Sequence, residues 1–264
     1  MHKKEEVILK VENISMSYDR PILRDVNFEI HNITRPNLLQ GQVVSLIGRS
    51  GIGKTQLFKI LSGLLEPKTG TVKIGSDLHP VVAGEVGIVP QNYILFNHRS
   101  ILDNLLLGLR GSINKLSEKD RLELINNYAA KFALKEHLKK YPMQLSGGQR
   151  QRVSIIQQIL TGNKFILLDE PFSGLDPIIK DKVLDLLVSI SELDEHNTLI
   201  IVSHDIENSL AISDTAFILA NQEHKEGATI TETIDLIEMG LCWDRDIKKN
   251  KNFQDLVAQM KFRM

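Results

Sequence analysis

Eight consecutive residues of this chain fit the phosphate-binding pattern G-x-x-x-x-G-K-[ST]: Gly48, Arg49, Ser50, Gly51, Ile52, Gly53, Lys54 and Thr55. Glycines let successive backbone N–H groups turn toward an anion, a lysine ammonium can reach the outer phosphates, and a threonine hydroxyl can ligate magnesium. A glycine turn could also match this pattern by chance. However, the apolar run 42–47 before it is typical of a buried strand, and residues 56–61 after it are typical of a helix. This context favours a nucleotide-phosphate site.

Two carboxylates end another apolar run. Residues 164–168 read Lys-Phe-Ile-Leu-Leu and lead into Asp169, Glu170 and Pro171. The run is typical of a parallel strand that is buried on both faces and opens into a site at its carboxyl end. Asp169 could hold magnesium through water, and Glu170 could take a proton from an attacking water. Two acids at a strand end can also cap a helix, but Pro171 ends the strand sharply and keeps Glu170 close to it.

A histidine and a tyrosine occupy positions from which they could contact a nucleotide. His204 follows the apolar run 198–203, so we expect it at the same sheet edge as the two acids, within reach of a γ-phosphate. A lone histidine more often has a structural role. Tyr18 lies in a predicted loop between two strands, where its ring could stack on a base or simply pack locally. Position alone leaves both alternatives open.

Two predicted helices begin with residues that suit capping. Ser146, Gly147, Gly148 and Gln149 precede an apolar-periodic helix, with Ser146 as the N-cap and glycines that leave backbone N–H groups free. This is a second possible anion-binding helix start, although an ordinary capped helix explains it as well. Asp176 stands before a proline, which is typical of an N-cap followed by proline at the first helical position and is a complete structural explanation.

Composition narrows the classes of function. The chain has 264 residues, with 32 Lys+Arg against 33 Asp+Glu and a formal net charge of -1, so no nucleic-acid partner is expected. Cys242 is the single cysteine and the amino terminus lacks a signal-peptide pattern, which together predict a reducing, cytosolic location. The apolar runs are far shorter than the ~20 residues that cross a bilayer. Work at a membrane would therefore require a partner.

The remaining patterns predict an order of elements. Runs 7–11 and 26–30 predict an antiparallel β-subdomain, and the irregular stretch 31–40 predicts a loop longer than strand pairing requires. A helix to about residue 65 and a pair of short strands through residue 89 follow. Apolar residues at helical spacing then predict an inserted helical subdomain over about 92–158.

The end of the chain is predicted to differ in character. Residues 1–220 are predicted to form the nucleotide-binding domain, with a final strand at 218–220. Residues 221–264 are predicted to be an extension that is first irregular and then ends in an amphipathic helix. Phe253, Leu256, Val257 and Met260 share one face of that helix, which predicts packing on the body of the protein. A regulatory or dimer-contacting role is left open.

Six motifs, taken in chain order, resemble those of the ATP-binding subunit of an ABC transporter, up to about residue 220: 48–55, Gln91, 145–149, 165–170, 173–176 and His204. The most discriminating motif is Leu-Ser-Gly-Gly-Gln at 145–149, which separates this family from other phosphate-loop ATPases. The resemblance implies an α/β fold: a P-loop NTPase (RecA-like) core with an N-terminal antiparallel β-subdomain and an inserted α-helical subdomain.

The resemblance also implies roles for single residues. Tyr18 matches the adenine-stacking aromatic, Gln91 the glutamine that senses the γ-phosphate and magnesium, Glu170 the catalytic carboxylate, Asp176 the residue that couples two sites, and His204 the switch histidine. ATP and Mg2+ are implied as cofactors, with the metal at Thr55, Gln91 and Asp169. Residues 146–149 would complete the site of another subunit, which implies a head-to-tail dimer with a second copy or a paralogue.

Some residues depart from the family pattern. Gln56 stands where the family usually has a second Ser or Thr, so the hydroxyl contact to the α-phosphate is in doubt. Arg49 and the stretch 31–40 are also unusual. Residues 40–44, 90–96 and 235–244 resemble the branch of nitrate, sulfonate and taurine importers, on less specific residues.

The predicted function is hydrolysis of ATP to energise a multi-subunit importer of small solutes. The chain would lie on the cytoplasmic face of the cell membrane through permease subunits, with a substrate-binding protein as a further partner of the permease. An exporter or lipid-transport ATPase is an alternative, because the cassette does not reveal direction. A soluble ABC ATPase acting on DNA or ribosomes is disfavoured, since short helices rather than a coiled coil fill the roughly 90 residues between the phosphate loop and the signature.

Overall fold

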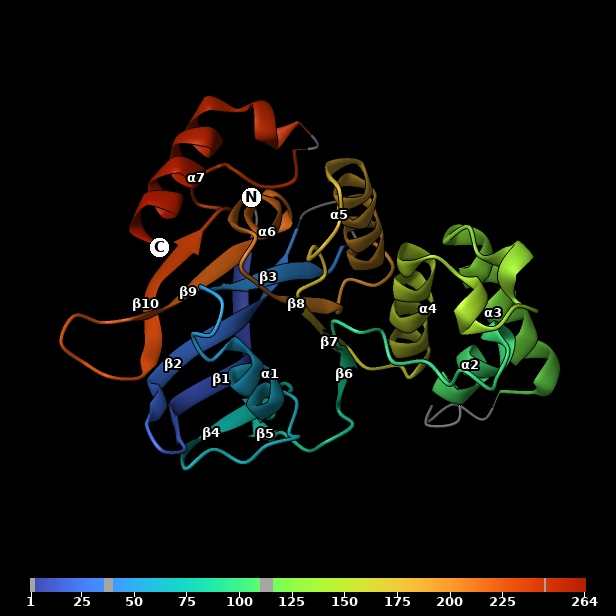
Figure 1. Ribbon diagram of the computed structural model, residues 1–264, viewed down its shortest axis with the longest axis horizontal. Coiled ribbons are helices and arrows are strands. Elements are labelled where there is room, and N and C mark those ends of the chain that lie inside the picture. Colours follow the sequence, from blue (N-terminus) through green and yellow to red (C-terminus); the bar gives the residue numbers. More distant parts are fainter. Residues whose placement is uncertain (1–2, 36–39, 110–115, 245) are drawn as a thin grey trace.

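A mixed β-sheet runs through the protein (Figure 1). The computed structural model describes residues 3–35, 40–109, 116–244 and 246–264. In these ranges, ten strands lie in the order β5-β4-β1-β2-β10-β9-β3-β8-β7-β6. No helix in the same ranges is both long and apolar enough to span a membrane.

Five strands form the parallel part of the sheet: β3 (Gln42–Ile47), β6 (Val86–Val89), β7 (Phe165–Asp169), β8 (Thr198–Ser203) and β9 (Thr215–Asn221). Every residue of β3 and β8 is buried, because helices cover both faces. Val44 packs in one hydrophobic cluster with Leu57 of α1 (Lys54–Leu61). Its neighbour Val43 packs in another cluster with Leu187 of α5 (Pro177–Ser191). The predicted buried strands are confirmed.

The other strands make the antiparallel part: β1 (Lys3–Ser17), β2 (Pro21–Thr34), β4 (Thr69–Ile74), β5 (His79–Pro80) and β10 (Ala228–Asp235), with β2 and β10 running parallel to each other at one residue pair. β2 alternates buried and exposed residues from Val26 to Ile30, as predicted. The prediction that a loop begins at residue 31 is wrong, because β2 continues to Thr34 in pairing with β1. Residues 36–39 of that stretch lie outside the described residues.

Two predicted boundaries are corrected. α1 ends at Leu61 rather than near residue 65, because Gly63 adopts a left-handed conformation with φ of 71°. Residues 218–220 do not form the final strand, since β10 follows and pairs with β9 from Ala228 to Asp235. The stretch after residue 221 is therefore not irregular throughout, because a strand of the main sheet follows the turn at residues 222–227.

Helices gather on one side of the sheet body in Figure 1, as predicted for the region between residues 92 and 158. They are α2 (Ile101–Gly108), α3 (Glu118–Lys131), the short 3-10 helices η1 (Lys135–His137) and η2 (Pro142–Gln144), and α4 (Gly147–Leu160). Ile101, Leu105, Ile125 and Val153 are fully buried in the cluster that holds these helices together. The same cluster continues into the parallel strands, which ties the helical region to the sheet.

The C-terminal segment packs on the sheet body, as predicted. It contains the 3-10 helix η3 (Ile247–Lys249) and α7 (Lys251–Arg263), and Figure 1 shows α7 beside α6 (Ile206–Ile212) and the end of β10. Phe253, Val257 and Met260 are buried in one cluster with Leu210 of α6 and Ile234 of β10. The apolar face of α7 is therefore part of the core.

A buried ion pair, here called the Asp214 cluster (Arg35, Asp214 and Trp243), joins three distant segments. Arg35 Nη2 lies 2.8 Å from Asp214 Oδ1, and Trp243 Nε1 donates to that same oxygen at 2.6 Å. The Arg35 guanidinium lies 4.7 Å from the centre of the Trp243 ring and donates to the Gly41 carbonyl at 2.7 Å. Asp214 Oδ2 accepts the Val43 N–H at 2.9 Å. The end of β2, the start of β3 and the C-terminal segment meet here.

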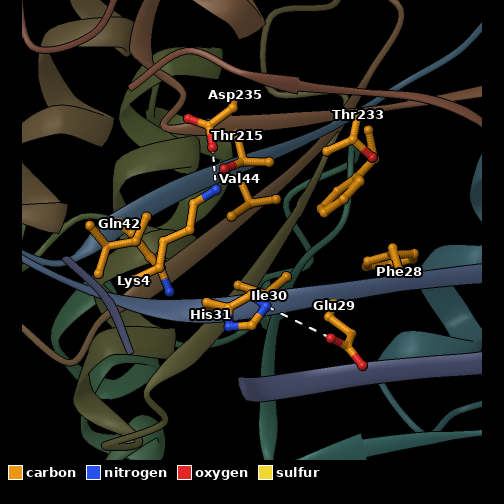
Figure 2. Close-up of a pocket in the computed structure, with 12 residues that line it drawn as sticks. Lys4, Phe28, Glu29, Ile30, His31, Gln42, Val44, Thr215, Thr233 and Asp235 are labelled. Carbon is orange, nitrogen blue, oxygen red and sulfur yellow. Dashed lines mark hydrogen bonds and ion pairs between the residues drawn. The ribbon is translucent and has the colours of Figure 1, made fainter. Parts of the chain in front are cut away.

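A cavity of about 260 Å³ opens where β2 leaves its neighbour in the sheet. β2 pairs with β10 only at Leu23 and Ala228, so the strands separate beyond that point. Figure 2 shows that the charged side chains of this cavity face one another in pairs, Lys4 with Asp235 and His31 with Glu29. The Lys4–Asp235 pair links β1 to β10 beside this gap, whereas His31 and Glu29 both lie on β2.

His79, in the edge strand β5, contacts two carboxylates. His79 Nδ1 lies 2.8 Å from Asp77 Oδ1, and Nε2 lies 3.0 Å from Glu85 Oε1. The hydrogen bonds to Asp77 and, secondly, to Glu85 raise the pKa of His79 above its ordinary value. These two contacts link the turn before β5 to the turn before β6 through His79.

Candidate functional site

The phosphate loop lies between the carboxyl end of β3 and the start of α1, as predicted from the sequence. Gly53 is the N-cap of α1 with φ of 112°, and a Cβ there would lie 2.9 Å from the side chain of Ile22. Only glycine combines that conformation with that close approach. The N-terminus of α1 and the backbone of residues 50–53 face a cavity of about 550 Å³. This arrangement suits an anion.

The Lys54 side chain is buried against the phosphate loop, residues 48–55. Its ammonium donates to the carbonyls of Gly48 at 2.8 Å and Arg49 at 3.0 Å, and it lies 3.2 Å from Glu170 Oε1. Only 8% of the Lys54 side chain is exposed. The positive charge is thereby held between the phosphate loop and the end of β7.

Glu170 is held by groups from two strand ends. Its backbone has φ of 49°, in the left-handed region, and its N–H donates to the Val202 carbonyl at 2.8 Å. Glu170 Oε2 accepts the Ser203 hydroxyl at 3.2 Å and lies 2.8 Å from His204 Nδ1. A strained conformation fixed by so many contacts is typical of a functional residue. The predicted meeting of Glu170 and His204 at one sheet edge is confirmed.

Electrostatics keep Glu170 ionised. Burial tends to raise the pKa of this carboxyl, but the His204 hydrogen bond and the charge of Lys54 outweigh it and hold the pKa below its ordinary value. The neighbouring Asp169 has the opposite shift. Burial and then the charge of Glu170 raise the pKa of Asp169, and Lys54 only partly opposes them. The two adjacent acids therefore differ in environment, and Glu170 is the one held in its ionised form between Lys54 and His204.

Further predicted residues line the same cavity. Thr55, Gln56, Gln91 and Asp169 are among its lining residues, together with Glu170. Gln91 Nε2 donates to the Ser173 hydroxyl at 3.3 Å, which links it to the turn after β7. The cavity thus brings together, among its lining groups, an anion-binding loop, the Thr55 hydroxyl, the amides of Gln56 and Gln91, and the carboxylates of Asp169 and Glu170.

The motif at residues 146–149 lies elsewhere. Ser146 caps α4 by accepting the Gln149 N–H at 3.3 Å, and Gln149 Oε1 accepts the Ser146 N–H at 2.9 Å. Ser146, Gly147, Gly148 and Gln149 line a different cavity of about 370 Å³, which shares no lining residue with the phosphate-loop cavity. Asp176 is the N-cap of α5 and accepts the Ile179 N–H at 3.1 Å. Within one chain, residues 146–149 and the phosphate loop therefore line separate cavities.

A family model described as "ABC transporter" matches residues 31–173, which is 143 of the 264 residues. The chain belongs to the ABC transporter ATP-binding family. The predicted P-loop NTPase fold, the enzyme class of ATPase and the binding of ATP are thereby confirmed, and they agree with the cavity described above.

Named relatives and solved structures agree with the family assignment. The thiamine import ATP-binding protein of Aliivibrio fischeri is 34% identical over 72% of this chain and 82% of the relative. A sulfate/thiosulfate import ATP-binding protein of Agrobacterium fabrum is 31% identical over 86% of this chain and 65% of that longer relative. The cbiO1 subunit of Clostridium perfringens, part of an ABC transporter complex, has a TM-score of 0.74 with 26% identity over 97% of this chain and 100% of that one.

A third kind of relative is a dimer. An ATP-binding cassette in a dimeric post-hydrolysis state bound to ADP and Pi has a TM-score of 0.69 with 25% identity, over 87% of this chain and 99% of that one. Its fold is that of an ABC ATPase, like the fold described above.

Tyr18 lies between β1 and β2, as predicted. It is 58% exposed, and its hydroxyl donates to Gln56 Oε1 at 3.3 Å. Gln56, the departure from the family pattern, is therefore a partner of Tyr18. The stacking of Tyr18 on a base stays a prediction.

Sequence reasoning missed several residues that line the nucleotide cavity. Arg20 precedes β2, Pro21 and Ile22 begin it, Asn221 ends β9, and Glu226 and Gly227 come from the β9–β10 turn. The sequence prediction lacks β10, whose residues are Ala-Thr-Ile-Thr-Glu-Thr-Ile-Asp. Its β-branched residues and alternation are a strand signal, which could have revealed the turn.

Proposed function

We propose that this chain hydrolyses ATP at the phosphate-loop cavity and so energises a multi-subunit ABC importer of a small solute. The observation that carries the proposal is the position of Glu170, ionised and held between Lys54 and His204 beside the phosphate loop. The named import relatives support the direction of transport. Their cargoes differ, so the solute class is left broad.

The residues of the cavity divide the chemistry between them. Backbone N–H groups of residues 50–53 and the dipole of α1 stabilise phosphate charge, and Lys54 can move from Glu170 and the loop carbonyls to the outer phosphates. Glu170 then accepts a proton from the attacking water, while His204, exposed on its far side, contacts the γ-phosphate. When Lys54 leaves Glu170 and binds a phosphate, the Glu170 carboxylate becomes free to accept the proton.

Mg2+ fits the residues present. Thr55, Gln91 and Asp169 line the phosphate-loop cavity, and they offer the oxygen ligands that magnesium prefers. No cluster of three or more His, Cys, Asp or Glu side chains suited to a metal is found among the described residues, so the ion would share its coordination with phosphate oxygens. When bound, it neutralises phosphate charge. The raised pKa of Asp169 would fall beside that charge.

A second subunit completes the site in this proposal. Because residues 146–149 and the phosphate loop line separate cavities of one chain, we infer that the signature motif serves the phosphate loop of a partner. The partner is a second copy or a paralogue, arranged head to tail. Asp176, next to the signature cavity, would couple the two sites, and permease subunits would hold the pair at the inner face of the membrane.

The central experiment replaces Glu170 by Gln. We expect ATP hydrolysis to fall about 10²- to 10⁴-fold, the range for loss of a general base, while ATP binding is retained. Glu195→Gln, which alters an exposed carboxylate in the turn before β8, is the matched control and should leave turnover unchanged. Wild-type turnover in Glu170→Gln would remove the catalytic assignment.

Mixing two inactive variants tests the shared site. Lys54→Ala and Ser146→Arg should each be inactive alone, and their mixture should recover part of the activity, because each heterodimer contains at most one intact composite site. Hydrolysis at the wild-type rate by either variant as a monomer would contradict the shared site.

A further inference from the structure

The β9–β10 turn, residues 222–227, forms one end of the nucleotide cavity. Asn221, Glu226 and Gly227 line the cavity together with the phosphate loop. The turn is held on β2, because Arg24 donates to the Glu226 carbonyl at 3.3 Å and to Gln222 Oε1 at 3.0 Å. Its position is therefore set by the same strand that follows Tyr18.

Close packing restricts this turn further. Gly227 has φ of 85°, and a Cβ there would lie 3.1 Å from Arg24 Cβ and 3.2 Å from Pro21 Cβ. Glycine lets the turn lie directly against the start of β2. The turn thus presents Glu226 to the cavity from a supported backbone.

Strand order shows which part of a nucleotide would meet this turn. From β3, which carries the phosphate loop, the sheet continues through β8 to β7 and β6 on one side, and these strands place Glu170 and Gln91. On the other side it continues through β9 and β10 to β2, which place Asn221, Glu226 and Pro21. If the terminal phosphate lies beside Glu170, the sugar and base extend toward the β9–β10 turn.

Charge decides what Glu226 can bind. Its side chain is exposed, and its carboxylate forms no ion pair with any residue of the described ranges. An anion would be repelled by this group, whereas a carboxylate accepts hydrogen bonds well from neutral hydroxyl donors. The ribose of a nucleotide carries two such hydroxyls, and carboxylates bind ribose in this way in other nucleotide sites.

We propose that Glu226 is a specificity-determining residue that accepts hydrogen bonds from the ribose hydroxyls of the bound nucleotide. The site then selects ribonucleotides over nucleotides that lack these hydroxyls. This inference rests on the nucleotide binding proposed above.

The experiment compares the dissociation constants of ATP and 2′,3′-dideoxy-ATP for the full-length chain. A hydrogen bond to a partly exposed charged group predicts wild-type binding of ATP about 3- to 10-fold tighter than that of the dideoxy analogue. Glu226→Ala should bring this ratio close to one by weakening ATP alone. Glu226→Gln, which keeps an acceptor without the charge, should give an intermediate ratio.

Glu223→Ala is the matched control, since it removes a carboxylate from the same turn but from a position that does not line the cavity. It should keep the wild-type ratio. Equal binding of the two nucleotides by the wild type, or an unchanged ratio in Glu226→Ala, would overturn the role of Glu226 while leaving ATP binding intact. Failure of the wild type to bind ATP at all would instead overturn the proposed function.

Discussion

The Asp214 cluster predicts a large loss of stability from a substitution far from the phosphate loop. Asp214→Asn keeps the shape of the side chain but leaves the Arg35 guanidinium, with a side chain only 3% exposed, without its counter-charge. Removing one partner of a buried pair costs about 3–5 kcal/mol. Arg35 retains its bonds to the carbonyls of Gln40 and Gly41, both at 2.7 Å, so we expect the lower end, about 3 kcal/mol.

The single tryptophan lets an unfolding experiment follow the Asp214 cluster separately from the rest of the protein. Trp243 is the only tryptophan of the chain and lies inside the cluster, so its fluorescence reports opening of this joint. Urea unfolding followed by fluorescence gives the free energy of opening the Asp214 cluster, and unfolding followed by far-UV circular dichroism gives the free energy of losing the secondary structure. In the wild type the two transitions should coincide, whereas in Asp214→Asn the fluorescence change should come first, because the C-terminal segment is released from β3.

A double-mutant cycle isolates the pair itself. Arg35→Met combined with Asp214→Asn should destabilise the protein less than the sum of the single variants, by about 2 kcal/mol or more, since neither charge is then left buried alone. Asp181→Asn, which removes the exposed partner of Lys248, is the control and should stay within about 0.5 kcal/mol of the wild type. An Asp214→Asn loss below about 1 kcal/mol, or strict additivity in the cycle, would refute the reasoning.

Three other perturbations test separate parts of the structure. His79→Gln should make the free energy of unfolding depend less on pH. Because the pKa of His79 is raised in the folded protein, its contribution to stability is complete below its unfolded pKa of 6.5 and is lost as the pH rises through its folded pKa. Unfolding measured across that range checks this, and an unraised His79 pKa in an NMR titration would contradict it. Phe253→Ala should cost about 3–5 kcal/mol in urea unfolding, because Phe253 is 1% exposed, and a cost under 1 kcal/mol would mean that α7 is not part of the core. Gln56→Thr should weaken ATP binding about two- to fivefold by removing the partner of Tyr18, and tighter binding would show that a hydroxyl near the α-phosphate matters more.

The motifs around the phosphate-loop cavity could be predicted from sequence because each is local. The phosphate loop needs a strand, glycines and a helix in succession, and each leaves a pattern in adjacent residues. The same holds for Asp169 and Glu170 at the end of β7 and for Ser146 at the start of α4. The meeting of the phosphate loop with Asp169 and Glu170 follows from the rule that parallel strands present their carboxyl ends at one edge, whereas this rule does not place Ser146.

Errors arose where pairing partners are distant in sequence. β10 continues the sheet between β9 and β2, and its single pair with β2 joins Ala228 to Leu23. No neighbour in sequence signals that contact. Likewise, β2 runs to Thr34 because β1 pairs with it as far as Lys3, although its last residues read as a polar loop.

Local sequence therefore revealed the family of this chain and pointed to the groups that we propose bind phosphate and accept a proton. Tertiary structure decided how these groups are held. It placed Lys54 against Glu170, gave Asp169 and Glu170 opposite pKa shifts, and brought Glu226 to the nucleotide cavity. The physical reason is that burial, charge proximity and strand order depend on contacts between segments far apart in the chain, whereas motif chemistry depends only on neighbours.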